Sequence, residues 1–211
     1  ERLECSNLME IIIIATTENP KDDPIEELAL QKGFNVYRGS EENVLDRVLE
    51  AAQTFSVTNI VELHGDNPFL DPAIIDKCIK IFDSGEYDYL ANDLVKTFPQ
   101  GTRIQIFPTE KLSEVRKITN DPAVQEHVSL YFYENLEKYR NFNLEAEPDI
   151  RKPELRFTVD TIEDFNFISS IYEIVIKKGL KPDFSISEAI KIIDENSLKI
   201  LNSNISSKPI R

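Results

Sequence analysis

Two short stretches decide how we expect this chain to fold: HGDNPFLDP at residues 64–72 and TVDTIEDF at residues 158–165. Each follows an apolar run typical of a buried strand and leads into a helical pattern. Because the carboxyl ends of parallel strands meet at one edge of a sheet, Asp66 and Asp160 can hold a divalent cation against a phosphate. We expect both to be catalytic residues and Mg²⁺ ligands, with Gly65 letting the backbone approach a ligand.

The neighbouring aspartates have ordinary structural interpretations. Asp71 precedes a proline, and an aspartate in that position is a common helix cap. Thr161 and Asp164 have the spacing of a capping box, which leaves Asp160 without a structural task. For Asp66 a second interpretation stays open, since an aspartate after a strand also caps turns.

Working outward, the chain alternates between strand and helix patterns as far as residue 90. Asp23 and Ser40 are placed to cap the first two helices. The alternation is typical of an α/β fold in which a parallel sheet carries helices on both faces. The expected strands cover residues 9–15, 35–38, 59–63 and 87–90.

The pattern changes after residue 92. Alternating residues at 103–107 predict a hairpin or an antiparallel edge, and the chain is then polar and irregular to about residue 153. The apolar run at 155–159 predicts a return to the sheet. Ser185 and Glu188 form a second capping box before the last helix.

The chain is strongly acidic. Its 211 residues carry a formal net charge of −14, which repels nucleic acid and anionic membranes. A chain of this length can bury the core of a single domain, so we expect one domain over residues 1–211. An anionic ligand would need basic residues gathered at its site, and the first candidates are Arg38, Arg47, Arg103 and Arg156.

Several classes of site are disfavoured. Cys5 and Cys78 are too few for a disulfide framework, and we expect reduced thiols in a cytoplasmic protein. His64 and His127 lack the companions that a zinc site needs. The sequence contains no phosphate-binding P-loop, dinucleotide glycine motif or nucleophile elbow. We expect neither a signal peptide nor a membrane span.

A possible anion contact lies at Arg38-Gly39-Ser40, where a predicted strand gives way to a helix. Backbone amides at a helix start favour anions, and Arg38 adds charge. A simple turn explains the same residues equally well. By pattern alone, Arg47 is a surface arginine.

Taken in order, the motifs of this chain form a recognisable series: IATT (14–17), RGSEENVLDR (38–47), GDNPFLDP (65–72), DYLAN (88–92), EHV (126–128) and TVDTIEDF (158–165). The series resembles the cytidylyltransferase family that includes acylneuraminate and ketodeoxyoctulosonate cytidylyltransferases. It is most similar to the SpsF-like branch of spore-coat polysaccharide biosynthesis. The likeness runs from the first residues to about Tyr172.

The resemblance implies a three-layer α/β/α Rossmann-like nucleotidyltransferase fold with a mostly parallel sheet. Members use CTP and Mg²⁺ to activate an acidic sugar such as a nonulosonic acid, forming a CMP-sugar for surface polysaccharide and releasing pyrophosphate. An inserted hairpin region builds a homodimer, and residues 96–149 are its expected counterpart here.

The resemblance also assigns roles to individual residues. Asp66 and Asp160 match the two magnesium-holding aspartates. The nucleotide-binding positions are Arg38, Gly39 and Arg47, together with Gly65. The sugar-binding positions are Asn92, Gln105 and His127.

This chain departs from the family pattern in three places. The opening strand and the arginine-rich loop that binds the triphosphate are not found before Glu1, and without them we expect no turnover. Gln105 stands where many relatives have glutamate, and Glu62 stands where SpsF-like relatives often have arginine. A non-catalytic nucleotide-binding, sugar-binding or dimerising homologue therefore remains the alternative. A glycosyltransferase is disfavoured, because Asp66 is not part of an Asp-x-Asp motif.

Overall fold

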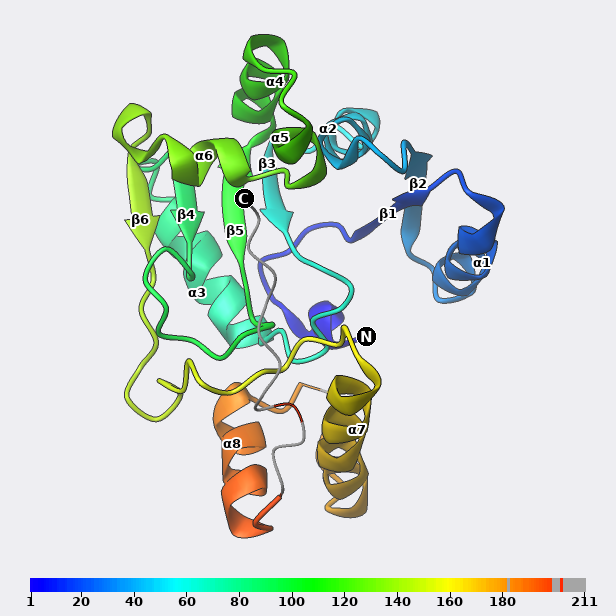
Figure 1. Ribbon diagram of the computed structural model, residues 1–211, viewed down its shortest axis with the longest axis vertical. Coiled ribbons are helices and arrows are strands. Elements are labelled where there is room, and N and C mark those ends of the chain that lie inside the picture. The colour runs from blue at the N-terminus through cyan, green and yellow to red at the C-terminus, as the bar shows by residue number, and fades with distance from the viewer. Residues whose placement is uncertain (182, 199–201, 203–211) are drawn as a thin grey trace.

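The structure is a computed structural model that describes residues 1–181, 183–198 and 202 (Figure 1). The strands are β1 (Ile13–Thr17), β2 (Asn35–Gly39), β3 (Asn59–Glu62), β4 (Tyr89–Ala91), β5 (Gln105–Pro108) and β6 (Asn141–Asn143). The α-helices are α1 (Asp23–Gln31), α2 (Val44–Thr54), α3 (Pro72–Phe82), α4 (Thr109–Ile118), α5 (Pro122–Glu126), α6 (Leu130–Glu134), α7 (Ile162–Lys177) and α8 (Ile186–Glu195). Three short 3-10 helices are η1 (Arg2–Cys5), η2 (Pro20–Asp22) and η3 (Leu136–Lys138).

The larger sheet has four strands in the order β3-β5-β4-β6. β6 runs parallel to β4, whereas β5 is antiparallel to both β3 and β4. All strands of this sheet except β5 therefore share one direction, as the mostly parallel prediction requires. The antiparallel segment was expected as a hairpin or an edge. It instead fills the gap between β3 and β4, so its residues from Gln105 to Phe107 are fully buried.

The sheet separates two hydrophobic cores. Side chains on one face, such as Tyr89 and Phe107, pack with α2, α4, α5 and α6. Their strand neighbours Leu90 and Ile106 point to the other face and pack with α3, α7 and α8. This alternation follows from the two-residue period of a strand. It confirms the expected α/β architecture with helices on both faces of a sheet.

β1 and β2 form a separate two-stranded parallel sheet. We call the segment from β1 to β2, with α1, the N-terminal lobe (residues 13–39). Figure 1 shows it set to one side of the larger sheet, with α2 between them. α1 buries only Ala29, and it leaves three large apolar side chains exposed: Ile25, Leu28 and Leu30.

The strand expected at 155–159 is wrong. In this described stretch the structure has a single bridge, between Gln100 and Arg156. Phe157 N donates to the Gln100 carbonyl (2.7 Å). Gly101, which follows Gln100, has φ +81°. A Cβ on Gly101 would lie 2.2 Å from Thr158 N, so this close crossing requires glycine. The segment therefore crosses another loop and does not extend the sheet.

The helix starts are mostly as predicted. Asp71 caps α3, and capping boxes begin α7 at Thr161 and α8 at Ser185. The expected cap at Ser40 is wrong, because its hydroxyl closes the preceding turn and Asn43 caps α2. Asp23 is already the first residue of α1. Among the helices in the described residues, none is both long and apolar enough to cross a membrane.

Candidate active site at the ends of β3 and β4

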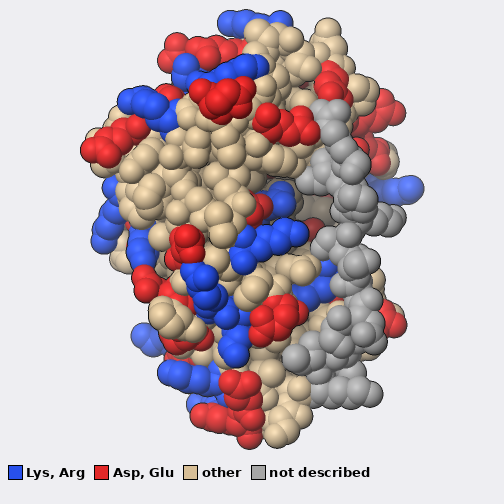
Figure 2. Space-filling view, turned by 60° about the vertical axis from the view of Figure 1, so that its left-hand side comes forward, with Lys and Arg blue, Asp and Glu red and all other residues tan. Residues whose placement is uncertain are grey.

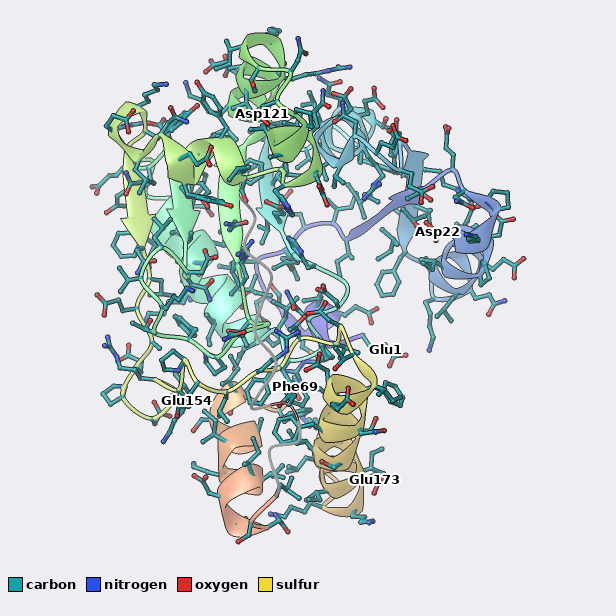
Figure 3. The ribbon with its side chains drawn as sticks, viewed as in Figure 1. Glu1, Asp22, Phe69, Asp121, Glu154 and Glu173 are labelled. Atoms are coloured by element: carbon teal, nitrogen blue, oxygen red, sulfur yellow. The ribbon has the colours of Figure 1, made fainter. Side chains whose placement is uncertain are left out.

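The turn after β3 holds Asp66 in an exposed position on a firmly anchored loop. Phe69 is fully buried, with its ring centroid 4.9 Å from Phe157 and 5.2 Å from Tyr172. Figure 3 shows Phe69 lying towards the upper ends of α7 and α8. The Tyr172 hydroxyl also donates to the Pro68 carbonyl (2.9 Å). Apolar packing below the turn therefore fixes the backbone that carries Asp66.

The turns that carry the two predicted metal ligands are joined by a backbone hydrogen bond. Val159 N donates to the Asp66 carbonyl oxygen at 2.9 Å. Figure 1 shows the loop after β3 beside the segment that enters α7. Asp160 follows Val159 and is exposed, as is Asp66. The fold thus brings together two turns that carry aspartates 94 positions apart in the sequence.

Asp160 is held by a buried ionic network. Arg156 donates to Asp160 and, at 2.9 Å, to Asp164, which is fully buried. The Asp164 carboxylate also accepts from the backbone N of Asp160 (3.0 Å) and from the Asn202 amide (2.7 Å). Burial opposes ionisation of Asp164, but these hydrogen bonds and the Arg156 charge outweigh it and lower its pKa to about 2.

The pair suits a magnesium ion shared with a ligand. In the described residues no three His, Cys, Asp or Glu side chains are arranged to hold a metal by themselves. Mg²⁺ in nucleotide sites commonly takes one or two protein carboxylates and completes its shell with phosphate oxygens and water. Asp66 and Asp160 are exposed and lie on turns joined through Val159, and carboxylates placed in this way fit that arrangement.

The predicted nucleotide residues lie on and beside the N-terminal lobe. Arg38 is bound within the lobe, since its Nη1 pairs with Asp23 (2.6 Å) and Glu26 (2.7 Å). Its other nitrogens donate to the carbonyls of Thr17 and Asn19. These contacts connect β1, α1 and β2, so Arg38 has a clear structural task.

Gly39 and Arg47 pack against one another. A Cβ on Gly39 would lie 2.9 Å from Tyr37 Cε1 and 3.1 Å from Arg47 Cγ. Arg47 donates to the Ser40 carbonyl (2.6 Å), and burial lowers the pKa of its guanidinium. An open hollow beside them is lined by Glu18, Asn19, Pro20, Tyr37, Gly39, Ser40, Glu41 and Glu50. At Gly65, by contrast, a Cβ would meet no atom within 4 Å.

Two of the predicted sugar residues are buried and fully engaged. The Asn92 amide donates to the Thr102 carbonyl and accepts from Ile104 N, both at 2.8 Å. Gln105 donates to the Tyr89 hydroxyl (2.8 Å) and accepts from Ser129 (2.6 Å). These bonds join β4, β5 and the start of α6.

The third, His127, directly follows α5 as its C-cap residue and is half-buried. It lies two residues before Ser129, so the hydrogen bond from Ser129 to Gln105 ties its loop to β5.

A polar group that sequence reasoning did not assemble lies beside them: Glu62, Asp93, Arg103 and Tyr133, hereafter the Glu62 cluster. Arg103 Nε pairs with Asp93 Oδ2 at 2.7 Å, and His64 Nε2 lies 3.4 Å from Glu62 Oε1. Hydrogen bonding to Glu62 raises the pKa of His64, and burial raises the pKa of Asp93. Arg103 and Glu62 had each been noted in the sequence, and Asp93 directly follows a strand-end asparagine. Nothing in the sequence distinguishes Tyr133 from the aromatic residues beside it.

Comparisons with known proteins give the same assignment as the motifs. A sequence model of the family described as cytidylyltransferase matches residues 1–201. The spore coat polysaccharide biosynthesis protein SpsF of Bacillus subtilis (strain 168) is 37% identical over 188 residues, which are 88% of this chain and 75% of SpsF.

Solved structures add the fold. A cytidylyltransferase from Leptospira borgpetersenii serovar Hardjo-bovis has a TM-score of 0.85 and 32% identity, covering 99% of this chain and 85% of its own. A CMP:2-keto-3-deoxy-manno-octonic acid synthetase complexed with CTP has a TM-score of 0.55 at 13% identity, covering 84% of this chain and 85% of its own, and shows a shared fold alone. The chain belongs to the cytidylyltransferase family.

Proposed function

We propose that this protein is a Mg²⁺-dependent cytidylyltransferase that transfers CMP from CTP to an acidic sugar for polysaccharide biosynthesis. One observation supports the proposal: in a chain of this family, Val159, the residue before Asp160, donates its backbone N–H to the Asp66 carbonyl, so the turns that carry the two exposed aspartates touch. The name of SpsF supports a role in polysaccharide biosynthesis. The acidic sugar, such as a nonulosonic acid, rests on the motif series.

The proposed reaction is a direct displacement at phosphorus. The anomeric oxygen of the sugar bonds to the α-phosphorus of CTP, and the bond from that phosphorus to the bridging oxygen breaks. Pyrophosphate leaves with the electron pair, and the hydroxyl proton passes to solvent. Such transfers need alignment and charge neutralisation more than a covalent catalyst.

Asp66 and Asp160 are the proposed Mg²⁺ ligands. When bound, the ion would supply positive charge beside the phosphates. Arg156 and Asp164 hold Asp160 in place through the buried network, and packing of Phe69 holds the turn of Asp66. The protein thereby fixes two negative side chains on rigid backbone before substrates arrive.

The nucleotide and sugar take opposite sides of this pair in the proposal. Gly39 and Arg47, with Gly65, contact the nucleotide, and Arg38 supports them by joining β1, α1 and β2. His127 contacts the sugar, while Asn92 and Gln105 shape its site through their buried hydrogen bonds.

The direct test is pyrophosphate release by the protein expressed from its whole coding sequence, with CTP, Mg²⁺ and a panel of acidic sugars. Release that needs both the metal and one sugar supports the proposal, and no release with any sugar contradicts it. Binding of CTP or sugar without release would instead indicate the non-catalytic alternative.

We also propose that the protein forms a homodimer through residues 96–149. β6 ends the four-stranded sheet, and this side of the molecule comes forward in Figure 2, where charged side chains border a broad uncharged area. An edge strand beside an uncharged surface suits association with a second copy. Sedimentation velocity of wild-type protein measures the oligomeric state, and a monomer at all concentrations contradicts the proposal.

A further inference from the structure

The Glu62 cluster contains buried oxygen atoms that the protein does not satisfy. Within the described part of the chain, Glu62 Oε2, Asp93 Oδ1 and the Tyr133 hydroxyl have no hydrogen-bond partner. The side chain of Glu62 is only 10% exposed. Buried polar atoms without partners are uncommon and cost free energy, so three in one cluster indicate a place where a ligand supplies the missing bonds.

The cluster is assembled from separate segments. Glu62 ends β3 and pairs in register with Gln105 of β5, which also faces Ala91 of β4. Asp93 lies two residues after β4, and Arg103 lies two residues before β5. Arg103 pairs with Asp93 at 2.7 Å, Asp93 interacts electrostatically with Glu62, and all three interact with Tyr133 of α6, so the four side chains gather at this end of the sheet.

The cluster adjoins the proposed reaction centre. His64 lies between Glu62 and Asp66 in the sequence and is coupled electrostatically to both. A sugar whose anomeric hydroxyl is near Asp66 would thus extend its other substituents towards Glu62. The Glu62 cluster is placed to contact the acceptor and not the triphosphate.

The charge of the Glu62 cluster, and the number of hydrogen-bond donors it requires, decide which kind of sugar substituent it can bind. Two carboxylates face one permanent cation, Arg103, and one titrating side chain, His64. The Arg103–Asp93 pair engages Asp93 Oδ2 while Oδ1 remains unpartnered. Carboxylate oxygens accept hydrogen bonds and cannot donate them. A protonated amino group brings three donors and a positive charge, whereas a hydroxyl brings one donor and no charge.

We propose that the acceptor sugar carries a free, unacylated amino group, which binds as an ammonium to Glu62 and Asp93, with Tyr133 contacting a neighbouring hydroxyl. This inference rests on the proposed function for the position of the sugar. The predicted binding is specific to the free amine, since acylation removes both the charge and two of the three hydrogen-bond donors.

The test compares matched acceptors. The probes are an eight-carbon 3-deoxy-2-keto sugar acid, versions with one hydroxyl replaced by an amino group at successive positions, and the N-acetyl derivative of each. Binding to the purified protein is measured by calorimetry without CTP, and pyrophosphate release is measured with CTP and Mg²⁺. We expect one amino acceptor to bind at least about tenfold more tightly than its N-acetyl derivative, as expected for hydrogen bonds to charged groups.

Variants locate the effect. Glu62→Gln and Asp93→Asn should each reduce the preference for the amine by about tenfold, while Tyr133→Phe should weaken amine and acetamide equally. Glu86→Gln, the same change at an exposed position, is the control. Thermal unfolding identifies any variant that has lost its fold.

The outcomes separate this inference from the proposed function. Equal binding of every amine and its acetamide overturns the inference, as does a preference that survives both carboxylate variants. Absence of pyrophosphate release with every acceptor contradicts the proposed function alone, because the binding comparison still decides whether the cluster selects an amine.

Discussion

The N-terminal lobe buries far fewer of its side chains than the four-stranded sheet and its helices do. In the lobe, α1 buries one residue, whereas α3 beside the sheet buries six, and all of β4 is buried. The aspartate pair belongs to the packed region, while Gly39 lies on the lobe. A catalytic charge needs a fixed position, whereas a segment with little buried area can move at small cost. The comparison therefore suggests fixed metal ligands beside an adaptable nucleotide support.

The strongest challenge to this comparison is removal of the packing below Asp66. Phe69→Ala deletes a fully buried ring that contacts Phe157, Tyr172 and Phe184. We expect the free energy of unfolding to fall by about 3–5 kcal/mol. Urea unfolding measures it. A loss below about 1 kcal/mol would show that the turn does not depend on this core.

The next effect is on activity, with little change in stability. Asp66→Asn and Asp160→Asn should each lower kcat by about 10²–10³-fold, the range found when one preorganised electrostatic group is removed. Both side chains are exposed, so the free energy of unfolding should change little. Asp160→Asn removes a half-exposed ion pair with Arg156, which should cost no more than about 1 kcal/mol. Pyrophosphate release measures the rate, with Glu163→Gln as an exposed control nearby. Near-normal rates in both variants would remove the aspartates from the mechanism.

The buried network under Asp160 predicts a pH dependence. The folded-state pKa of Asp164 is lowered from 3.8 to about 2, so its contribution is present above about pH 4 and lost as the pH falls through about 2. Asp164→Asn should cost about 2 kcal/mol of unfolding free energy at pH 6. The difference from wild type should shrink as the pH approaches 2. Urea unfolding at several pH values checks this, and a constant difference would contradict it.

A smaller effect on CTP binding should distinguish the contribution of Gly39, on the N-terminal lobe, from that of Gly65, in the turn after β3. Gly39→Ala places a Cβ against Tyr37 and Arg47, and we expect KM for CTP to rise about tenfold, equivalent to about 1.4 kcal/mol. Gly65→Ala meets no protein atom, so any rise in KM there reports contact with bound nucleotide. If neither variant alters CTP binding, the nucleotide lies elsewhere.

Sequence patterns predicted the elements whose causes are local. The caps at Asp71, Thr161 and Ser185 follow from a side chain and the next few residues, and the structure confirms them. The strand at 155–159 failed because Gly101, far away in sequence, brings another backbone across it. The Glu62 cluster could not be foreseen for the same reason. Its members come from β3, from the segments after β4 and before β5, and from α6, and their missing partners are visible only once burial is known.

The smallest predicted effect tests the lobe from its own side. Leu28 on α1 is 57% exposed, and most of its surface already contacts solvent. Leu28→Ala should change the free energy of unfolding by no more than about 0.5 kcal/mol, because little apolar area is lost and alanine is the better helix former. This is the same truncation to alanine as at Phe69, measured by the same urea unfolding. A loss of several kcal/mol would mean that the α1 surface is covered in solution, for example by a second copy. The contrast between a packed sheet and a lightly held lobe would then describe the isolated chain and not the working protein.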